Sequence, residues 1–173
     1  KNKAEALADS HRAFYPRIEV VPDYLDLFHE VVGTSVPNVI FCFADNHPCR
    51  KNVLQLCDTL ETTAILAGNA MTDEDAYIYK GKKFVGLNDP RVRFPEILTS
   101  EAGDPIQPLG CASEAALAAE PQLASANFIA AAFALKLFVL HFSNEFAEVP
   151  DDCKATMYHS NFNRIMSVNH VSS

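Results

Sequence analysis

The stretch that decides the fold is Val39-Ile40-Phe41-Cys42-Phe43-Ala44, an unbroken apolar run that ends at the polar pair Asp45-Asn46. Apolar and polar residues do not alternate within it, and this pattern is typical of a parallel strand that is buried on both faces. Pro48 then opens a predicted helix that continues to about Leu60, because proline is tolerated in the first turn of a helix. A second apolar strand is predicted over 62–68.

The segments before this stretch also alternate between helices and strands, but the pattern changes after residue 68. Prolines between 88 and 121 preclude any long regular element, so we expect a long loop there. The pattern argues for βαβ units, and the predicted fold class is α/β: a Rossmann-like, mostly parallel sheet with a late hairpin or antiparallel strand and a long buried helix. The other predicted elements are helices over 3–14, 24–32 and 123–142, a strand over 18–21, a strand–turn–strand over 76–85 and a late strand within 154–168.

Composition limits the function classes. The 173 residues are 49% hydrophobic and 21% charged, which suits a single globular domain over 1–173. The net charge of −8 makes nucleic acid and membrane surfaces unexpected partners. The five cysteines form no Cys-x-x-Cys pair, so no structural zinc is expected, and this cysteine usage predicts a reducing, cytoplasmic location.

One segment tests the prediction of a soluble protein. Residues 123–142 are mostly apolar and long enough to span a bilayer. The segment carries Lys136, and a charge on the inner half of a membrane span is costly. We therefore interpret it as a core helix of an α/β domain, with a membrane span as the alternative.

Asp45, Asn46 and Arg50 are the first candidate site residues. Asp45 and Asn46 follow the central strand, at the carboxyl edge where open α/β sheets bind ligands, and a carboxylate there can hold a metal bound to phosphates. The alternative is a turn that caps the helix. Arg50 lies in the first turn of that helix, where a cation is unfavourable for the helix dipole. This position indicates a ligand contact, and the alternative is a solvated surface arginine.

Cys111 is the second candidate. It follows Pro108-Leu109-Gly110 in the predicted loop, outside any apolar run, so its thiol could be an exposed nucleophile. The alternative is an incidental loop cysteine. Asp73-Glu74-Asp75 is interpreted as a solvated turn, and the six histidines show no metal-ligand spacing.

The order of these motifs resembles the later part of a ThiF/MoeB/HesA-family domain, from the bacterial relatives of ubiquitin-activating enzymes. Members have a lysine-bearing helix, Asp-Asn-x-x-x-Arg after the central strand, and a cysteine before a long helix. The residues that carry the resemblance here are 1–8, 39–46 with Arg50, Gly68-Asn69 and Cys111. Residues 93–97, 111–117 and 158–168 look most similar to the ThiF proteins of PRTRC gene systems.

The resemblance implies adenylation. In the family, ATP and Mg²⁺ activate the C-terminal glycine carboxylate of a ubiquitin-like or sulfur-carrier protein, and some members pass the acyl group to a cysteine. By position, Lys3 would contact the ATP phosphates, Asp45 would hold Mg²⁺ and nucleotide, and Asn46 would shape the turn. Arg50 would lie beside them, and Cys111 would take the covalent step. A polyphosphate requires such a cation and a metal-holding carboxylate.

The sequence also departs from the family pattern. It contains no Gly-x-Gly-x-x-Gly, no pair of Cys-x-x-Cys motifs, and Asn2 where proline is usual. We therefore expect the C-terminal portion of an adenylating domain, inactive alone, that works with a missing N-terminal segment or as a homodimer. One alternative is a non-catalytic ThiF-like module that binds a partner protein through the 88–121 loop. Another is a different Rossmann enzyme, such as a dehydrogenase.

Overall fold

The computed structural model describes residues 3–17, 37–44, 47–69, 73–99, 124–161 and 164–169. The chain divides into two compact units, Lys1–Thr34 and Ser35–Ser173, and each is described by itself. The first holds helix α1 (Lys3–His11), in which Ala8 is buried and Leu7 is exposed. The predicted strand over 18–21 and helix over 24–32 lie outside the described residues.

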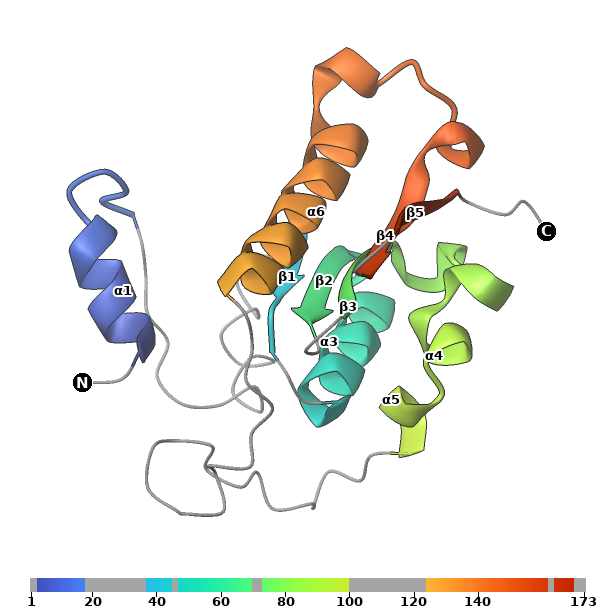
Figure 1. Cartoon of the computed structure of the whole chain (residues 1–173), viewed down its shortest axis with the longest axis horizontal. Helices are drawn as coiled ribbons and strands as arrows, with labels where there is room; N and C mark the ends of the chain where they lie inside the picture. The colour runs from blue at the N-terminus through green and yellow to red at the C-terminus, as the bar shows by residue number, and fades with distance from the viewer. Residues whose placement is uncertain are drawn as a thin grey trace. The chain divides into compact units, whose positions relative to one another are not determined.

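The second unit is built on a five-stranded sheet whose strands lie in sequence order (Figure 1). β1 and β2 run parallel, with Cys42 opposite Leu66, whereas every other neighbouring pair is antiparallel. The strands are β1 (Val39–Cys42), β2 (Thr63–Asn69), β3 (Asp73–Tyr79), β4 (Ala155–Asn161) and β5 (Arg164–Asn169).

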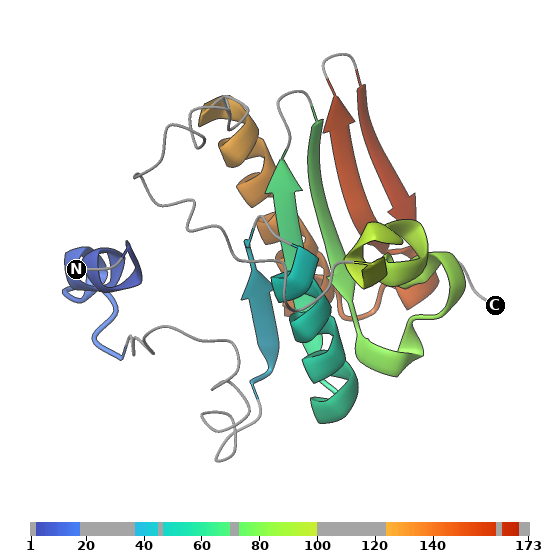
Figure 2. The ribbon, with the colours of Figure 1, turned by 90° about the horizontal axis from the view of Figure 1, so that it is seen from below.

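Helices cover both faces of this sheet (Figure 2). On one face, α6 (Ala124–Phe142) packs against β2 and β3, and Phe133 stacks on Tyr158 of β4 with ring centroids 5.5 Å apart. The other face holds α3 (His47–Leu60), α4 (Pro90–Arg93) and α5 (Glu96–Thr99). Single 3₁₀ turns at Gly81–Lys83, Gly86–Asn88, Asn144–Phe146 and Asp151–Cys153 complete the connections.

The core forms where the apolar runs of the sequence meet these helices. β2 is buried along most of its length, because helices lie above and below it. α3 contributes one apolar side, which includes Leu54 and Cys57, and α6 contributes Leu137. The side chains with under 2% exposure are Leu54, Cys57, Ile65, Leu66, Ile78, Tyr79, Ile97 and Leu137.

The predicted α/β class is confirmed, with its open sheet, late antiparallel strands and long helix. Parallel pairing is confined to β1 and β2 among the described strands. For the strand–turn–strand over 76–85, the first strand is confirmed as part of β3, but the second strand is wrong: 81–83 form a 3₁₀ turn, and β3 pairs with β2 and β4. The reason is that Phe84 is buried and packs edge-on to Tyr79, 6.3 Å between centroids, so this segment folds into the core.

β1 differs from the expectation of a strand covered on both faces. It lies at the edge of the described sheet, and Phe41 is 44% exposed. Its ring packs on Phe138 of α6 at 5.5 Å, so the α6 side of the strand is only partly covered by the described residues.

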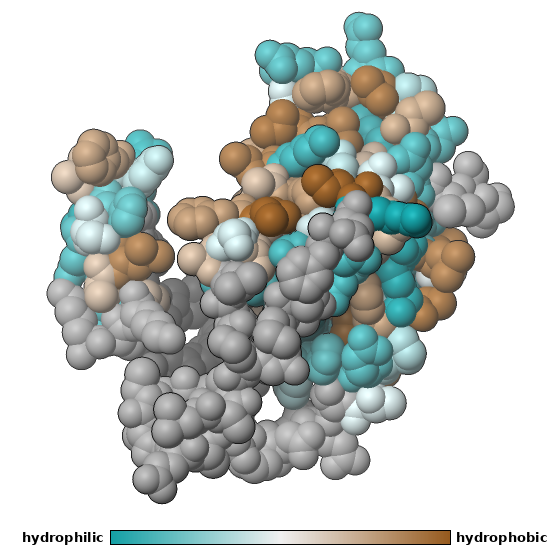
Figure 3. All heavy atoms as spheres, in the orientation of Figure 1, coloured by the Kyte–Doolittle hydropathy of each residue, from teal (hydrophilic) through white to brown (hydrophobic). Residues whose placement is uncertain are grey.

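Helix α6 confirms the predicted long helix, and its burial is confined to the side that faces the sheet. Ala126, Ala130, Phe133, Ala134 and Leu137 are buried there. The outward side keeps apolar side chains in contact with solvent, among them Phe128 and Leu135, and hydrophobic residues gather over α6 in Figure 3. By length and composition α6 could cross a membrane, but this is weak evidence because core helices of soluble proteins meet the same criterion.

Candidate functional site

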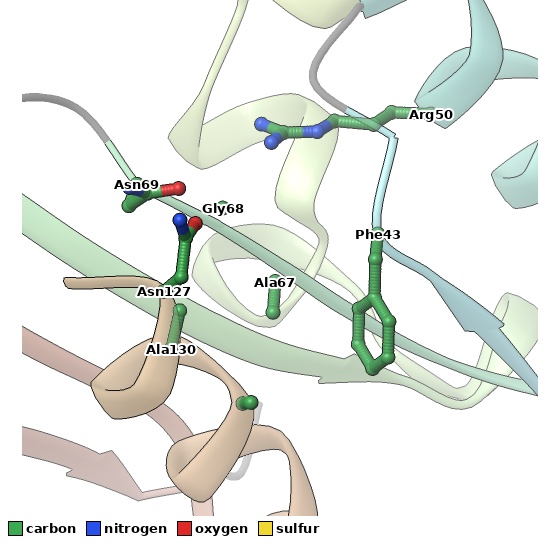
Figure 4. Close-up of a pocket in the computed structure, with 8 residues that line it drawn as sticks. Phe43, Arg50, Ala67, Gly68, Asn69, Asn127 and Ala130 are labelled. Carbon is green, nitrogen blue, oxygen red and sulfur yellow. The ribbon is translucent and has the colours of Figure 1, made fainter. Parts of the chain in front are cut away.

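The carboxyl ends of β1 and β2 meet at one edge of the sheet, as parallel strands require. A pocket of about 390 Å³ opens there, between the residues that follow β1, the first turn of α3, the end of β2 and the first turns of α6 (Figure 4). Open α/β sheets place their ligands at this edge. The pocket is lined by Phe43, Arg50, Ala67, Gly68, Asn69, Asn127, Ala130 and Ala131.

Arg50 supplies the positive charge of the pocket. Its Nε donates a hydrogen bond to the carbonyl oxygen of Ala44 at 3.1 Å, which orients the guanidinium. The guanidinium extends from α3 across the end of β2 (Figure 4), and its Nη1 and Nη2 groups form no hydrogen bond or ion pair with the described part of the chain. These N–H groups can therefore bind a carboxylate or a phosphate.

Gly68 allows this close approach of the guanidinium to the strand. A β-carbon built at Gly68 would lie 3.3 Å from Cζ of Arg50 and would overlap its Nη2. Any other residue at position 68 would therefore displace the arginine or be displaced by it. The glycine that ends the predicted second strand thus has a specific role, which is to make room for the cation.

The pocket spans both faces of the sheet because side chains alternate along β2. Gly68 pairs with Asp75 and faces Arg50 on the α3 side, whereas Ala67 and Asn69 face α6. Asn127 points from the first turns of α6 toward the end of β2, where Asn69 lies (Figure 4). The result is a cation on one side of the strand and two carboxamides on the other.

Three buried polar atoms on α3, β2 and β3 have no hydrogen-bond partner among the described residues. They are Nδ2 of Asn69, Nδ1 of His47 and the hydroxyl oxygen of Tyr77. Burial raises the pKa of Tyr77, while the charge of Arg50 opposes that rise, so this hydroxyl stays a protonated donor close to the guanidinium. Because buried polar groups in native proteins are nearly always hydrogen-bonded, these atoms indicate a place for a polar ligand or ordered water.

Cys42 lies beneath this site at the end of β1. A hydrogen bond with the thiol of Cys49 lowers the pKa of Cys42 to about 7. The backbone of Ala44 and the charge of Arg50 also lower this pKa, by smaller amounts, whereas burial raises it. The Cys42 side chain is only 4% exposed. The lowered pKa of this buried thiol is therefore due mainly to its hydrogen bond with Cys49, and the charge of Arg50 makes the smallest contribution.

A second polar cluster occupies the same edge on β3 and β4. Nδ1 of His159 lies 2.6 Å from Oδ1 of Asp75, and the hydroxyl of Ser160 donates to the carboxylate of Glu74. Glu74 is 9% exposed, so the interpretation of 73–75 as a solvated turn is wrong. These residues belong to paired strands, and each carboxylate is satisfied by a partner on β4.

The structure places only part of the predicted site. Arg50 lies at the carboxyl edge and lines the pocket, while its predicted ligand contact stays a prediction. Asp45, Asn46 and Cys111 lie outside the described residues. Lys3 begins α1 in the other unit, and its side chain also lies outside the described set. These four assignments stay predictions.

Asn69 and Asn127 were not among the predicted site residues. Asn69 could have been found, because it directly follows a buried strand at the ligand-binding edge. Asn127 carries no such signal in the sequence, because it lies within an apolar segment and its position depends on how α6 is seated on the sheet.

The described residues of this pocket include groups that suit the phosphates of ATP but no cluster that suits Mg²⁺. Arg50 and the unpartnered amide of Asn69 suit the oxygens of a phosphate or carboxylate. For the metal, the described residues contain no group of three or more His, Cys, Asp or Glu side chains that could hold an ion. The predicted magnesium ligand Asp45 lies outside those residues.

No protein-family model and no curated protein matches this sequence. The fold of this chain does resemble those of solved structures. A crystal structure of PaaA matches with 14% identity and a TM-score of 0.57, over 99% of this chain and 56% of PaaA. The complex of E. coli MccB with AMPCPP and MccA matches with 18% identity and a TM-score of 0.59, over 100% of this chain and 49% of MccB.

A third structure, E. coli MccB with ATP, matches with 18% identity and a TM-score of 0.55, over 100% of this chain and 48% of MccB. The chain thus spans about half the length of the solved proteins that it resembles. At these identities the similarity establishes the fold: the chain has the architecture of one half of PaaA and MccB.

Proposed function

We propose that this chain is part of an ATP-dependent adenylating enzyme of the ThiF/MoeB/HesA type, which activates the C-terminal carboxylate of a peptide or small protein. The observation that carries the proposal is the guanidinium of Arg50, which faces a pocket at the carboxyl edge of the sheet and whose Nη groups have no partner among the described residues. The fold supports it, because MccB has been crystallised with ATP and with AMPCPP plus MccA.

The proposed chemistry explains why a cation is needed at this edge. A carboxylate oxygen attacks the α-phosphorus of ATP, the bond to the β-phosphate oxygen breaks, and pyrophosphate leaves with those electrons. Both reactants are anions, so their approach is opposed by charge repulsion. A preoriented guanidinium in a partly buried pocket reduces this repulsion without having to reorganise during the reaction.

The remaining predicted residues complete the proposal. Lys3 contacts the phosphates, Asp45 holds Mg²⁺ with Asn46 shaping its turn, and Cys111 accepts the acyl group. A glycine-rich phosphate loop comes from a segment or chain other than residues 1–173. The partner is a ubiquitin-like or sulfur-carrier protein, the setting is a cytoplasmic, PRTRC-type system, and the working form is a homodimer or a complex with the segment that carries the loop.

ATP–pyrophosphate exchange tests the proposal. The protein as it occurs naturally, with any segment that accompanies this chain, is incubated with ATP, Mg²⁺, labelled pyrophosphate and peptides that end in a free carboxylate. We expect exchange that depends on the peptide and falls by about 10- to 150-fold in Arg50→Ala, the equivalent of one charged hydrogen-bonded contact. Arg12→Ala, in an exposed ion pair of α1, serves as the arginine control. Peptide-independent exchange, or an undiminished rate in Arg50→Ala, would overturn the proposal.

The alternative of a non-catalytic binding module has its own support. Apolar side chains on β1 and α6 are exposed, among them Phe41, Phe128 and Leu135, and surfaces of this kind often bind proteins. The exchange assay separates the two functions. Peptide or protein binding without exchange would favour the binding module.

A further inference from the structure

Asn69 and Asn127 form a pair of carboxamides at the wall of the pocket opposite Arg50. Asn69 ends β2 and Asn127 lies in the first turn of α6, and the two side chains approach the same space from different elements (Figure 4). They lie on the α6 side of the sheet, whereas the guanidinium lies on the α3 side. The pocket therefore offers a charged contact and two neutral contacts a short distance apart.

The carboxamide of Asn69 has unused hydrogen-bonding capacity. Its Nδ2 atom is buried and has no hydrogen-bond partner among the described residues. A buried N–H₂ group without a partner costs free energy, so a structure that keeps one usually satisfies it with a ligand or water. Each carboxamide provides both a donor and an acceptor, and an amide group is the neutral ligand that matches both.

The walls and size of the pocket are compatible with a short peptide segment. Phe43, Ala67, Ala130 and Ala131 supply small or apolar surface around the polar groups. A volume of about 390 Å³ is at the lower end of the range for small-molecule sites. This space suits one or two residues at the end of a peptide.

We propose that Asn69 and Asn127 bind an amide group at the carboxyl end of the peptide substrate while Arg50 holds its terminal carboxylate. This inference rests on the proposed adenylating function and deepens it by assigning specificity residues. The amide has two possible sources: the last backbone peptide bond, or the side chain of a terminal asparagine or glutamine. Both present the same donor and acceptor pair to the two carboxamides.

Peptide analogues distinguish the two sources. The probes are a peptide that ends in alanine, the same peptide with an ester in place of its last peptide bond, and the same peptide with terminal asparagine. If the backbone is bound, the ester analogue has a kcat/KM for exchange about 3- to 10-fold below that of the alanine peptide, the usual effect of one neutral hydrogen bond. If the side chain is bound, the asparagine peptide exceeds the alanine peptide by a similar factor.

Variants connect these preferences to the two residues. In Asn69→Ala and Asn127→Ala, the preference that the intact protein shows between paired peptides is expected to fall toward one, because the contact that creates it is gone. Ser125→Ala is the matched control, since Ser125 is exposed in the same turn of α6 and does not line the pocket. Thermal unfolding of each variant identifies any loss of folding.

The outcomes separate this inference from the proposed function. Exchange that shows no preference among the three peptides, or a preference that both variants retain, would overturn the assignment of the carboxamide pair while leaving adenylation intact. An absence of exchange with every peptide, in a folded protein that binds ATP, counts against the proposed function. In that case, fluorescence anisotropy of labelled alanine, ester and asparagine peptides still tests the pair, because its contacts do not require ATP, and equal affinities would refute it.

Discussion

Gly68→Ala offers the sharpest test of the geometry around Arg50. The new methyl group would lie 3.3 Å from Cζ of Arg50 and overlap Nη2, so the guanidinium must leave the surface of β2. If it thereby loses one charge-assisted contact with substrate, the cost is about 1.5–3 kcal/mol, or about a 10- to 150-fold fall in kcat/KM for ATP–pyrophosphate exchange. The free energy of unfolding should change by less than about 1 kcal/mol, because the arginine side chain can move.

A double-mutant cycle shows whether Gly68 acts through Arg50. Arg50→Ala alone should lose the same contact, and adding Gly68→Ala to it should cost almost nothing more, since no guanidinium remains to be displaced. The expected coupling free energy therefore equals the smaller of the two single effects. Additive losses, or a Gly68→Ala protein with unchanged exchange, would show that Gly68 does not position the arginine and would refute this reasoning.

Three further predictions concern stability. Arg91 binds Asp58 at 2.7 Å, Asp89 at 2.8 Å and the hydroxyl of Tyr79 at 2.6 Å, and its side chain is 20% exposed. Arg91→Ala should therefore lower the free energy of unfolding by about 3 kcal/mol in urea titrations. A loss no larger than that of Arg12→Ala would contradict this. Leu137→Ala should lower the free energy of unfolding by about 2–5 kcal/mol because Leu137 is fully buried. Leu135 is 60% exposed on the same helix, so Leu135→Ala should lower it far less. Equal losses would mean that α6 packs on the sheet through a different side. Burial lowers the pKa of His141, so the unfolded chain takes up the proton first as pH falls below about 6.5, and the free energy of unfolding should decline there. His141→Gln should flatten that part of the plot of urea midpoint against pH. An unchanged plot would count against this role of His141.

The elements that the sequence predicted well are those with strong local signals. The apolar run 39–44, Pro48 at the start of a helix, and the apolar strand over 62–68 correspond to β1, α3 and β2. Arg50 was found because its position in the first turn of α3 is unusual for a cation. Each of these signals comes from a few adjacent residues, so no knowledge of distant parts of the chain was needed.

The errors arose where distant segments decide the structure. The segment after Tyr79 has residues suited to a strand, but it forms a 3₁₀ turn that lets Phe84 pack against Tyr79. Likewise, the acidic residues 73–75 read as a turn, yet His159 and Ser160 of β4 satisfy Asp75 and Glu74 inside the sheet. In both cases the partner lies outside the local pattern, and the contact with it outweighs local preference.

The sequence alone determined the α/β class and the strand–helix–strand unit over 39–69, and it singled out Arg50 as a candidate, because residue type and periodicity act over short distances. Only the tertiary structure showed that Gly68 makes room for the guanidinium and that Asn69 and Asn127 line the same pocket. These contacts depend on the side of β2 that each residue faces and on where α6 is seated. Both are set by packing between segments far apart in the chain, so no local pattern contains them.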